Sequence, residues 1–237
     1  MNKKINIYFR QTSNGSGHDN ERPLWFDREK CFKNLLDTID NDLVRLVVVF
    51  DGDIESHFTS KYDGFEVVNI NAGSDWGSFT QTLDIIKKDN LSDDSIIYLL
   101  ENDYLHIDGW CEVMADLFNL YDDIGYVSLY DHFDKYIKIP DNKYYREEYQ
   151  TLTSHILTSS FCHWRTVPST CGTFAMTKKL FDLDYDVHMN FPGDYHKFIS
   201  LGKERHRTVL TPILGYSTHV MEGLLSPFRN WEKINNG

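Results

Sequence analysis

The feature that most constrains the fold is the alternation of short apolar runs with amphipathic segments across the first half of the chain. The apolar runs predict strands at residues 5–9, 43–50, 65–70 and 95–100. Between them, apolar side chains recur at helical spacing in residues 32–39 and 76–86. This alternation is typical of βαβ units, whose strands form a largely parallel sheet covered by helices.

The alternation ends after a third predicted helix, whose apolar positions run from residue 110 to 118, and a strand at residues 124–130. Residues 131–170 are polar, rich in Tyr, His and Trp, and show no clear period. We therefore expect long loops there that shape a binding surface. Later apolar runs predict a strand at residues 173–176, a helix at 195–201 ended by Gly202, and a strand at 208–214.

Length and hydropathy favour one soluble domain. A chain of 237 residues that is 41% hydrophobic and 14% aromatic can bury a substantial core. It contains no uninterrupted apolar run of about 18 residues, as a membrane-spanning helix would need. The opening residues lead into a strand rather than a signal peptide, so we expect a cytoplasmic protein with no integral membrane segment.

Charge and cysteine content exclude several classes of partner and scaffold. A net charge of −12 argues against nucleic-acid partners, because phosphate binding needs basic surface. The four cysteines are too few and too widely spaced for a disulfide scaffold or a CxxC metal site. We expect Cys31, Cys111, Cys162 and Cys171 to be reduced and mostly buried.

Acidic residues follow three of the predicted strands. They are Asp51 and Asp53, Glu101 and Asp103, and Asp131. Ligands of open α/β sheets bind where the carboxyl ends of the strands meet, and clustered carboxylates there suit a hard divalent cation. Two simpler interpretations stay open: ordinary turn chemistry for Asp51 and Asp53, and a helix cap or solvated loop for the Glu101-Asn102-Asp103 segment.

The run Ile97-Tyr98-Leu99-Leu100-Glu101-Asn102-Asp103-Tyr104 resembles the strand and DXD motif of GT-A glycosyltransferases. The segments 126–136, 163–165 and 217–219 are similar to those of uncharacterised viral and bacterial GT-A-like proteins. The resemblance covers nearly the whole chain. It implies an α/β GT-A (nucleotide-diphospho-sugar transferase) fold, with a mixed, mostly parallel central sheet flanked by helices.

The resemblance also implies how the chain is organised and what it does. Residues 1–237 would form one catalytic domain, with a nucleotide-binding half at 1–130 and an acceptor-binding and catalytic half at 131–237. The implied activity moves a sugar from a nucleotide-diphosphate sugar to an acceptor hydroxyl with the help of a metal ion. A protein of viral origin would act in the host cytoplasm.

The resemblance assigns expected roles to the acidic residues and one histidine. Asp103 would be the main metal ligand, with Glu101 near the ribose or a metal-bound water, and His219 would complete the coordination. An imidazole beside carboxylates favours Mn²⁺ over Mg²⁺. Asp51 would contact the base or ribose. The other expected nucleotide contacts are Gln11, Asn71, Gly73, Ser74 and Asn102.

The resemblance makes Asp194, in the Pro192-Gly193-Asp194-Tyr195 segment, the general base of an inverting transfer. The same position is also typical of an aspartate that caps a helix, and the two roles are compatible. Aromatic and charged side chains of the middle segment suit an acceptor pocket, because aromatic faces stack on sugars. These are Tyr130, Asp131, His132, His163, Trp164 and Arg165.

Two other functions compete with glycosyl transfer. Asp51, after a buried strand, also resembles the nucleophile of an aspartate-based phosphohydrolase or phosphotransferase. A non-catalytic module that binds sugar nucleotides would use the same scaffold, since a fold does not guarantee chemistry. A nucleotidyltransferase is disfavoured, because no glycine-rich, lysine-bearing phosphate loop lies near the N-terminus.

Overall fold

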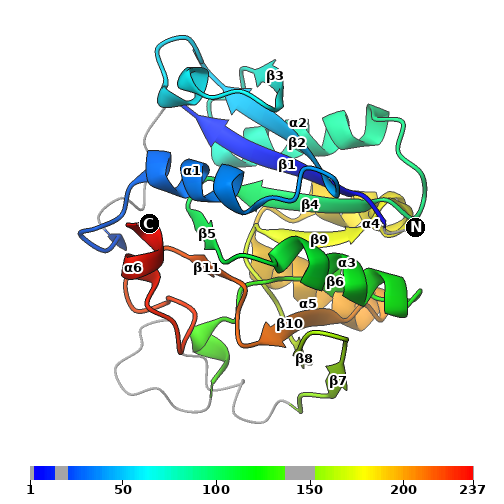
Figure 1. Ribbon diagram of the computed structural model, residues 1–237. Helices are drawn as coiled ribbons and strands as arrows, with labels where there is room; N and C mark the ends of the chain where they lie inside the picture. Colours follow the sequence, from blue (N-terminus) through cyan, green and yellow to red (C-terminus); the bar gives the residue numbers. More distant parts are fainter. Residues whose placement is uncertain (1–2, 14–20, 137–152, 237) are drawn as a thin grey trace.

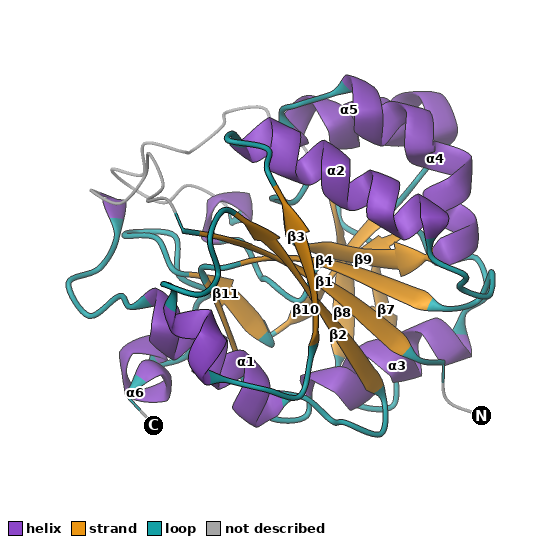
Figure 2. Ribbon diagram, turned by 90° about the horizontal axis from the view of Figure 1, so that it is seen from above, coloured by secondary structure: helices purple, strands orange, loops and turns teal. Residues whose placement is uncertain are grey.

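The computed structural model describes residues 3–13, 21–136 and 153–236, which form a central sheet between two layers of helices (Figures 1 and 2). The α-helices are α1 (Arg28–Thr38), α2 (Asp75–Lys88), α3 (Trp110–Leu120), α4 (Lys178–Asn190), α5 (Asp194–Arg205) and α6 (Trp231–Asn235). Two short 3₁₀ helices are η2 (Phe58–Lys61) and η3 (Phe133–Lys135). Figure 2 shows α2, α4 and α5 on one face of the sheet and α1, α3 and α6 on the other.

The strands build one large sheet and one small sheet. In chain order they are β1 (Ile5–Thr12), β2 (Val44–Asp51), β3 (Glu66–Ile70), β4 (Ile96–Glu101), β5 (Tyr104–His106), β6 (Tyr126–Val127), β7 (Ile156–Thr158), β8 (His163–Val167), β9 (Phe174–Thr177), β10 (Val209–Ile213) and β11 (Ser217–His219). The large sheet has nine strands in the order β3-β2-β1-β4-β9-β6-β10-β8-β7. The small one pairs β11 with β5 and lies beside α6 (Figure 1).

The first four strands of the large sheet are parallel, whereas β9 runs antiparallel to β4 and β6. β10 is parallel to β6, and β8 is antiparallel to β10 and β7. The sheet is therefore mixed and mostly parallel in its first half, with helices on both faces. This confirms the predicted fold class.

The central strands are mostly apolar because helices cover both of their faces. In β1, Ile5, Ile7 and Phe9 join the core that contains residues of α1 and α3. Tyr8, between them, joins the opposite core with residues of α2, α4 and α5. Successive side chains point to opposite faces of a strand, so the continuous apolar run indicated a doubly covered sheet.

The later part of the chain departs most from the sequence expectations. The expected strand at 124–130 is only two residues long, and the chain also forms β5, β7, β8, β11, α4 and α6, which periodicity did not reveal. α5 was expected to end at Gly202 but continues to Arg205, where His206 takes the left-handed conformation at φ 55°. Of its four last residues, Gly202, Lys203 and Glu204 are exposed, and Arg205 is bonded to α4 through Leu183 O at 3.1 Å and Asp186 Oδ2 at 2.7 Å, which offsets the cost of one interior glycine.

The described residues include no helix long and apolar enough to cross a membrane. All four cysteines are free, as expected. Cys31 and Cys111 are buried, whereas Cys162 and Cys171 are partly buried.

Two fully buried histidines make the folded state sensitive to acid. His106 and His188 are 0% exposed, and burial lowers the pKa of each to about 3. In the unfolded chain they take up a proton near pH 6.5, whereas the folded chain does not. Protons therefore bind to the unfolded chain alone, and the free energy of unfolding falls as the pH drops below the unfolded pKa of about 6.5. Above that pH these two histidines cause no loss.

We predict that each histidine costs about 1.2 kcal/mol of unfolding free energy between pH 7 and pH 5.5. His188→Gln keeps a polar partner for the Tyr126 hydroxyl, which lies 3.0 Å from Nε2, but cannot protonate. Urea unfolding at both pH values should show that this variant loses about 1.2 kcal/mol less than the unsubstituted protein. Equal losses in the two proteins would contradict the assignment.

Candidate functional site

The site lies at the carboxyl ends of β1 and β4, two neighbouring parallel strands, with β2 beside β1 on one side and β9 and β6 beyond β4 on the other. Ligands of open α/β sheets bind where the chain turns to opposite sides in this way. Gln11, near the end of β1, is buried and its Oε1 accepts a hydrogen bond of 2.6 Å from Asn102 Nδ2. Its Nε2 is buried without a partner among the described residues. Gln11 and Asn102, both predicted nucleotide contacts, are thus brought together, with one donor unsatisfied.

A buried arginine joins two acids at this edge. Arg10 on β1 lies opposite Glu101 on β4, and its Nη2 donates to Glu101 Oε1 at 2.7 Å. Its Nη1 donates to Asp75 Oδ1 at 2.9 Å, at the start of α2. The Arg10 side chain is only 8% exposed, so its two ion pairs compensate a charge that is removed from water.

Glu101 is held in a confined position. An added Cβ on Gly172 would lie 2.7 Å from Glu101 Oε1, so only glycine leaves room for the carboxylate there. Burial, together with the charges of Asp103 and Asp194, raises the pKa of Glu101 to about 7, although the charge of Arg10 opposes this rise. Glu101 therefore faces Arg10 rather than standing free as a metal ligand.

Asp194 is the first residue of α5, and Gly193 takes the capping position without a side-chain hydrogen bond. Lys197, one turn on, donates from Nζ to Asp194 Oδ1 at 3.2 Å, and its side chain is only 1% exposed. Burial lowers the pKa of Lys197, while Asp194 opposes that change. Asp194 is thus fixed by a buried lysine, and its charge acts on Glu101 and Arg10 across the crevice.

Asp103 and His219 meet in the small sheet, although 116 positions separate them. β5 and β11 pair Tyr104 with His219, which places His219 Nε2 3.2 Å from Asp103 Oδ2. The His219 ring stacks on Tyr104 with centroids 5.0 Å apart. Burial alone would raise the pKa of Asp103, but His219 and Arg22 hold it below its usual range.

Arg22 completes this cluster. Its Nη2 donates to Asp103 Oδ2, its Nη1 donates to Val220 O at 2.7 Å, and Nη1 lies 3.2 Å from His219 Nε2. The guanidinium therefore contacts one polar atom of each of two residues that were expected to bind a metal, Asp103 Oδ2 and His219 Nε2. Its side chain is 5% exposed.

The residues fit the expected metal only in part. Asp103 and His219 are adjacent, but Glu101 is paired with Arg10 and does not join them. Nowhere in residues 3–13, 21–136 and 153–236 do three His, Cys, Asp or Glu side chains form a group able to hold a metal. As arranged, the site holds an arginine where the third partner of Asp103 and His219 would be, and the Mn²⁺ or Mg²⁺ site stays a prediction.

Asp51 ties two loops together. Its Oδ1 accepts from Ala72 N at 2.8 Å and its Oδ2 from Gly73 N at 3.0 Å. Gly73 has φ 65°, and Ser74 caps α2 by accepting from Gly77 N. Asp51, Gly73 and Ser74 thus shape the loop between β3 and α2. Asn71 is exposed in the same loop, and Asp53 caps an exposed turn by accepting from Glu55 N.

The expected acceptor residues divide into two groups. Asp131 is buried, accepts from Arg165 Nη2 at 2.8 Å and from the Tyr136 hydroxyl, and burial raises its pKa. Tyr130 stacks close to His132 and also contacts the rings of Tyr104 and His219. This first group therefore borders the Asp103 cluster.

Trp164 and His163 lie apart from that group on β8. Trp164 is 0% exposed and packs in the core with its indole nitrogen donating to Ser159 Oγ, so no ring face is available to a sugar. His163 is exposed and faces solvent. Alternation along β8 explains the difference, because neighbouring residues point to opposite faces.

The cations Arg10, Arg22 and Lys197 were not singled out by sequence reasoning. Two of them had a signal in the sequence. A charged residue such as Arg10 inside an otherwise apolar strand has to find a buried partner, and Lys197 lies three residues after Asp194 on a predicted helix, where side chains meet. Arg22 lacks such a signal, since nothing near it in the sequence identifies its acid.

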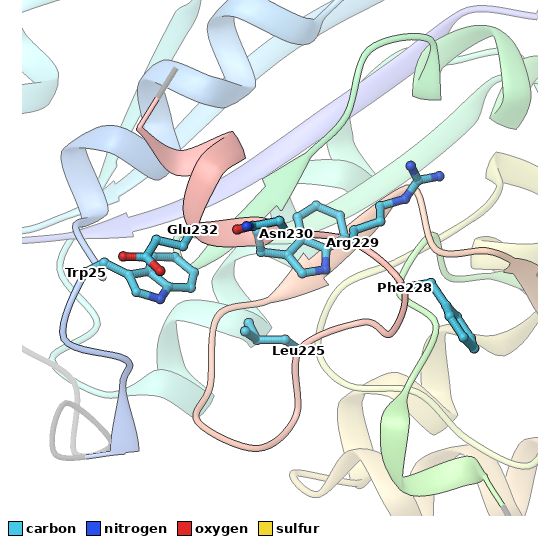
Figure 3. A pocket seen from close by; sticks show the side chains of 7 residues that line it. Trp25, Leu225, Phe228, Arg229, Asn230 and Glu232 are labelled. Atoms are coloured by element: carbon cyan, nitrogen blue, oxygen red, sulfur yellow. The ribbon is translucent and has the colours of Figure 1, made fainter.

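A separate groove of about 470 Å³ lies beside α6 (Figure 3). Its lining residues are Trp25, Leu225, Phe228, Arg229, Asn230, Trp231 and Glu232. The base of the groove is close to the Arg22 cluster, because Trp231 packs with Val220 and Leu105. Phe228 is 79% exposed and has φ 67°.

No protein-family model and no curated protein matches this chain. Among solved structures, it matches a protein of Desulfovibrio desulfuricans G20 named "putative nucleotide-diphospho-sugar transferase" with a TM-score of 0.51 and 11% identity, over 88% of this chain and 79% of the other. The fold is that of the nucleotide-diphospho-sugar transferases. The GT-A-like resemblance inferred from the sequence is confirmed at the level of the fold.

Two further matches have lower scores. TarS of S. aureus, residues 1–349, has a TM-score of 0.49 and 13% identity, and the match covers 88% of this chain and 57% of that one. The 4-diphosphocytidyl-2C-methyl-D-erythritol synthase of Anaerococcus prevotii DSM 20548 has a TM-score of 0.46 and 14% identity, over 89% of both chains.

Gly172→Ala tests how tightly Glu101 is held against Arg10. The new Cβ would meet the carboxylate at 2.7 Å and push it off the guanidinium. We expect the unfolding free energy to fall by about 1 to 3 kcal/mol in urea titrations. The control is Gly202→Ala in α5, where the nearest atom is 3.8 Å away and a helix gains up to about 1 kcal/mol.

A double variant separates this clash from other effects of Gly172→Ala. With Glu101→Ala already present, the added methyl group meets no carboxylate, so the second substitution should cost less than about 0.5 kcal/mol. Fully additive losses would show that the Gly172 contact with Glu101 is not the cause.

Proposed function

We propose that this protein is a glycosyltransferase that moves a sugar from a nucleotide-diphosphate sugar to an acceptor hydroxyl with inversion. The GT-A fold supports the donor class, and the carboxyl edge of β1 and β4 offers the crevice in which such folds bind ligands. The observation that carries the proposal is Asp194, an acid at the head of α5 that buried Lys197 holds across the crevice from Arg10 and Glu101.

In the proposed reaction, Asp194 acts as the general base. Lys197 engages Oδ1, and among the described residues Oδ2 has no bonded partner. Oδ2 would take the proton of the acceptor hydroxyl while that oxygen bonds to the anomeric carbon. The bond from this carbon to the diphosphate oxygen breaks on the opposite side, and the nucleoside diphosphate leaves with the electron pair.

The donor would lie along the carboxyl ends of β1 and β4. The unsatisfied Gln11 Nε2 suits a carbonyl or hydroxyl of the nucleoside, and Asn102 lies beside it. On the acceptor side, we propose the surface next to Arg165, which is partly exposed. Tyr130, Asp131, His132 and Trp164 are at most 5% exposed, so they would support this surface from beneath rather than line it.

The phosphohydrolase alternative depends on Asp51 as a nucleophile. Each of its carboxylate oxygens accepts a backbone N–H, from Ala72 and Gly73 respectively. Such bonds stabilise the carboxylate and reduce its reactivity toward phosphorus. This arrangement favours a structural role for Asp51 and weakens that alternative.

The first test identifies the donor. A thermal-shift screen of UDP, GDP, CDP and dTDP sugars, each with EDTA or Mn²⁺, should reveal one nucleotide class that raises the melting temperature. With that donor and a mixed panel of acceptors, the released product is then measured. Nucleoside diphosphate indicates glycosyl transfer, whereas release of pyrophosphate from a nucleoside triphosphate would instead indicate a nucleotidyltransferase.

Asp194→Asn tests the base. We predict that kcat falls by about 10²- to 10⁴-fold because the amide cannot accept the proton. Donor affinity in the thermal-shift assay should change little. The control is Asp182→Asn, which removes another helix-borne acid paired with lysines, on α4 away from the crevice. Full activity of Asp194→Asn would refute the mechanism, and persisting donor binding without any turnover in the unsubstituted protein would indicate a binding module.

A further inference from the structure

We propose that Arg22 supplies the cation that meets the donor diphosphate, at the position where the motif resemblance predicts a metal ion. The inference rests on the proposed function, because it concerns the donor of that same site. Asp103 would then orient an arginine rather than bind a metal.

Arg22 is held beside Asp103 and His219 by contacts on several sides. Arg22 donates from Nη2 to Asp103 Oδ2 and reaches His219 Nε2 from Nη1 at 3.2 Å. Its Nη1 is also fixed by Val220 O at 2.7 Å, and its guanidinium stacks on Phe26 with 5.0 Å from Cζ to the ring centroid. Asp103 and His219 therefore each present one polar atom to a positive charge that is anchored on two other sides, whereas Asp103 Oδ1 and His219 Nδ1 are buried without a partner among the described residues.

The positive charge of Arg22 opposes a metal ion at the same place. A divalent cation placed between Asp103 and His219 would lie against the guanidinium and be repelled, unless Arg22 first gave up its hydrogen bonds. A third protein ligand would then have to be found, and none of the described residues completes such a group. One fixed arginine already satisfies the charge of Asp103, so the cluster as built does not require a metal.

Arg22 keeps one N–H donor that no described residue satisfies. A guanidinium has five N–H groups in a rigid plane, a geometry that matches phosphate oxygens. Arg22 Nε is buried and has no partner among the described residues. An unsatisfied charged donor beside a buried carboxylate, at the end of the sheet where a diphosphate is expected, is accounted for by an anionic ligand.

The test measures binding of inorganic pyrophosphate by calorimetry in EDTA. We expect the unsubstituted protein to bind without metal and Arg22→Ala to bind about 10- to 100-fold more weakly, the loss typical of a charged hydrogen bond. Arg22→Lys should be intermediate, since it keeps the charge but not the fork. The matched control is Arg28→Ala, which removes the other arginine stacked on Phe26 and should bind normally.

A metal titration completes the test. Mn²⁺ alone should give no heat with the unsubstituted protein, whereas Arg22→Ala, with Asp103 and His219 released, should bind Mn²⁺ weakly. Melting temperatures identify any variant that fails to fold. If Arg22→Ala fails, binding by Arg22→Lys is compared with binding by the unsubstituted protein instead.

The outcomes separate this inference from the proposed function. Pyrophosphate binding that needs Mn²⁺, or that survives Arg22→Ala in EDTA, overturns the role of Arg22 and leaves glycosyl transfer standing. Absence of binding both with and without Mn²⁺ overturns the role of Arg22 and the proposed donor together. Metal-free binding lost in Arg22→Ala and kept in Arg28→Ala supports the inference.

Discussion

The carboxyl edge of the sheet depends on one constraint: a charged side chain that is withdrawn from water must be matched by an opposite charge or by hydrogen bonds. Three buried cations meet it. Arg10 joins Glu101 to Asp75, Lys197 holds Asp194, and Arg22 holds Asp103. Removing one partner of such a pair would leave an uncompensated buried charge, which is far more costly than losing an exposed ion pair. The crevice is therefore preorganised before any ligand enters.

The acids at this edge differ in how their carboxylate oxygens are bonded, and therefore in what they can do. Asp51 is bonded to two backbone N–H groups and shapes a loop, whereas Asp194 has one oxygen held and the other available. Glu101, with a pKa raised to about 7 by burial, lies between the charges of Arg10 and Asp194. An environment that sets neighbouring carboxylates to different states is what acid–base chemistry in such a crevice requires.

Sequence patterns were informative where the structure follows a period. The four strands and three helices predicted before residue 120 form as expected, because a doubly covered parallel sheet needs continuous apolar runs with helices between them. Strand ends marked Asp103 as a site candidate, and the resemblance to GT-A enzymes added roles for Asp194 and His219. Patterns were weak for the short strands: β7 and β8, after residue 130, are partly exposed, and β5 and β11 span only three residues each. Such strands exist because a neighbour pairs with them, not because of their own composition.

The sequence by itself determined the α/β fold class and which strand ends carry acids, because both follow from local periodicity and strand direction. Only the tertiary structure decided which charges meet. It joined Asp103 to His219 through β5 and β11, and it brought Arg22 to both from a distant segment. The reason is that a buried charge selects its partner by distance in the folded state, and that distance depends on how the whole chain packs rather than on any spacing along it.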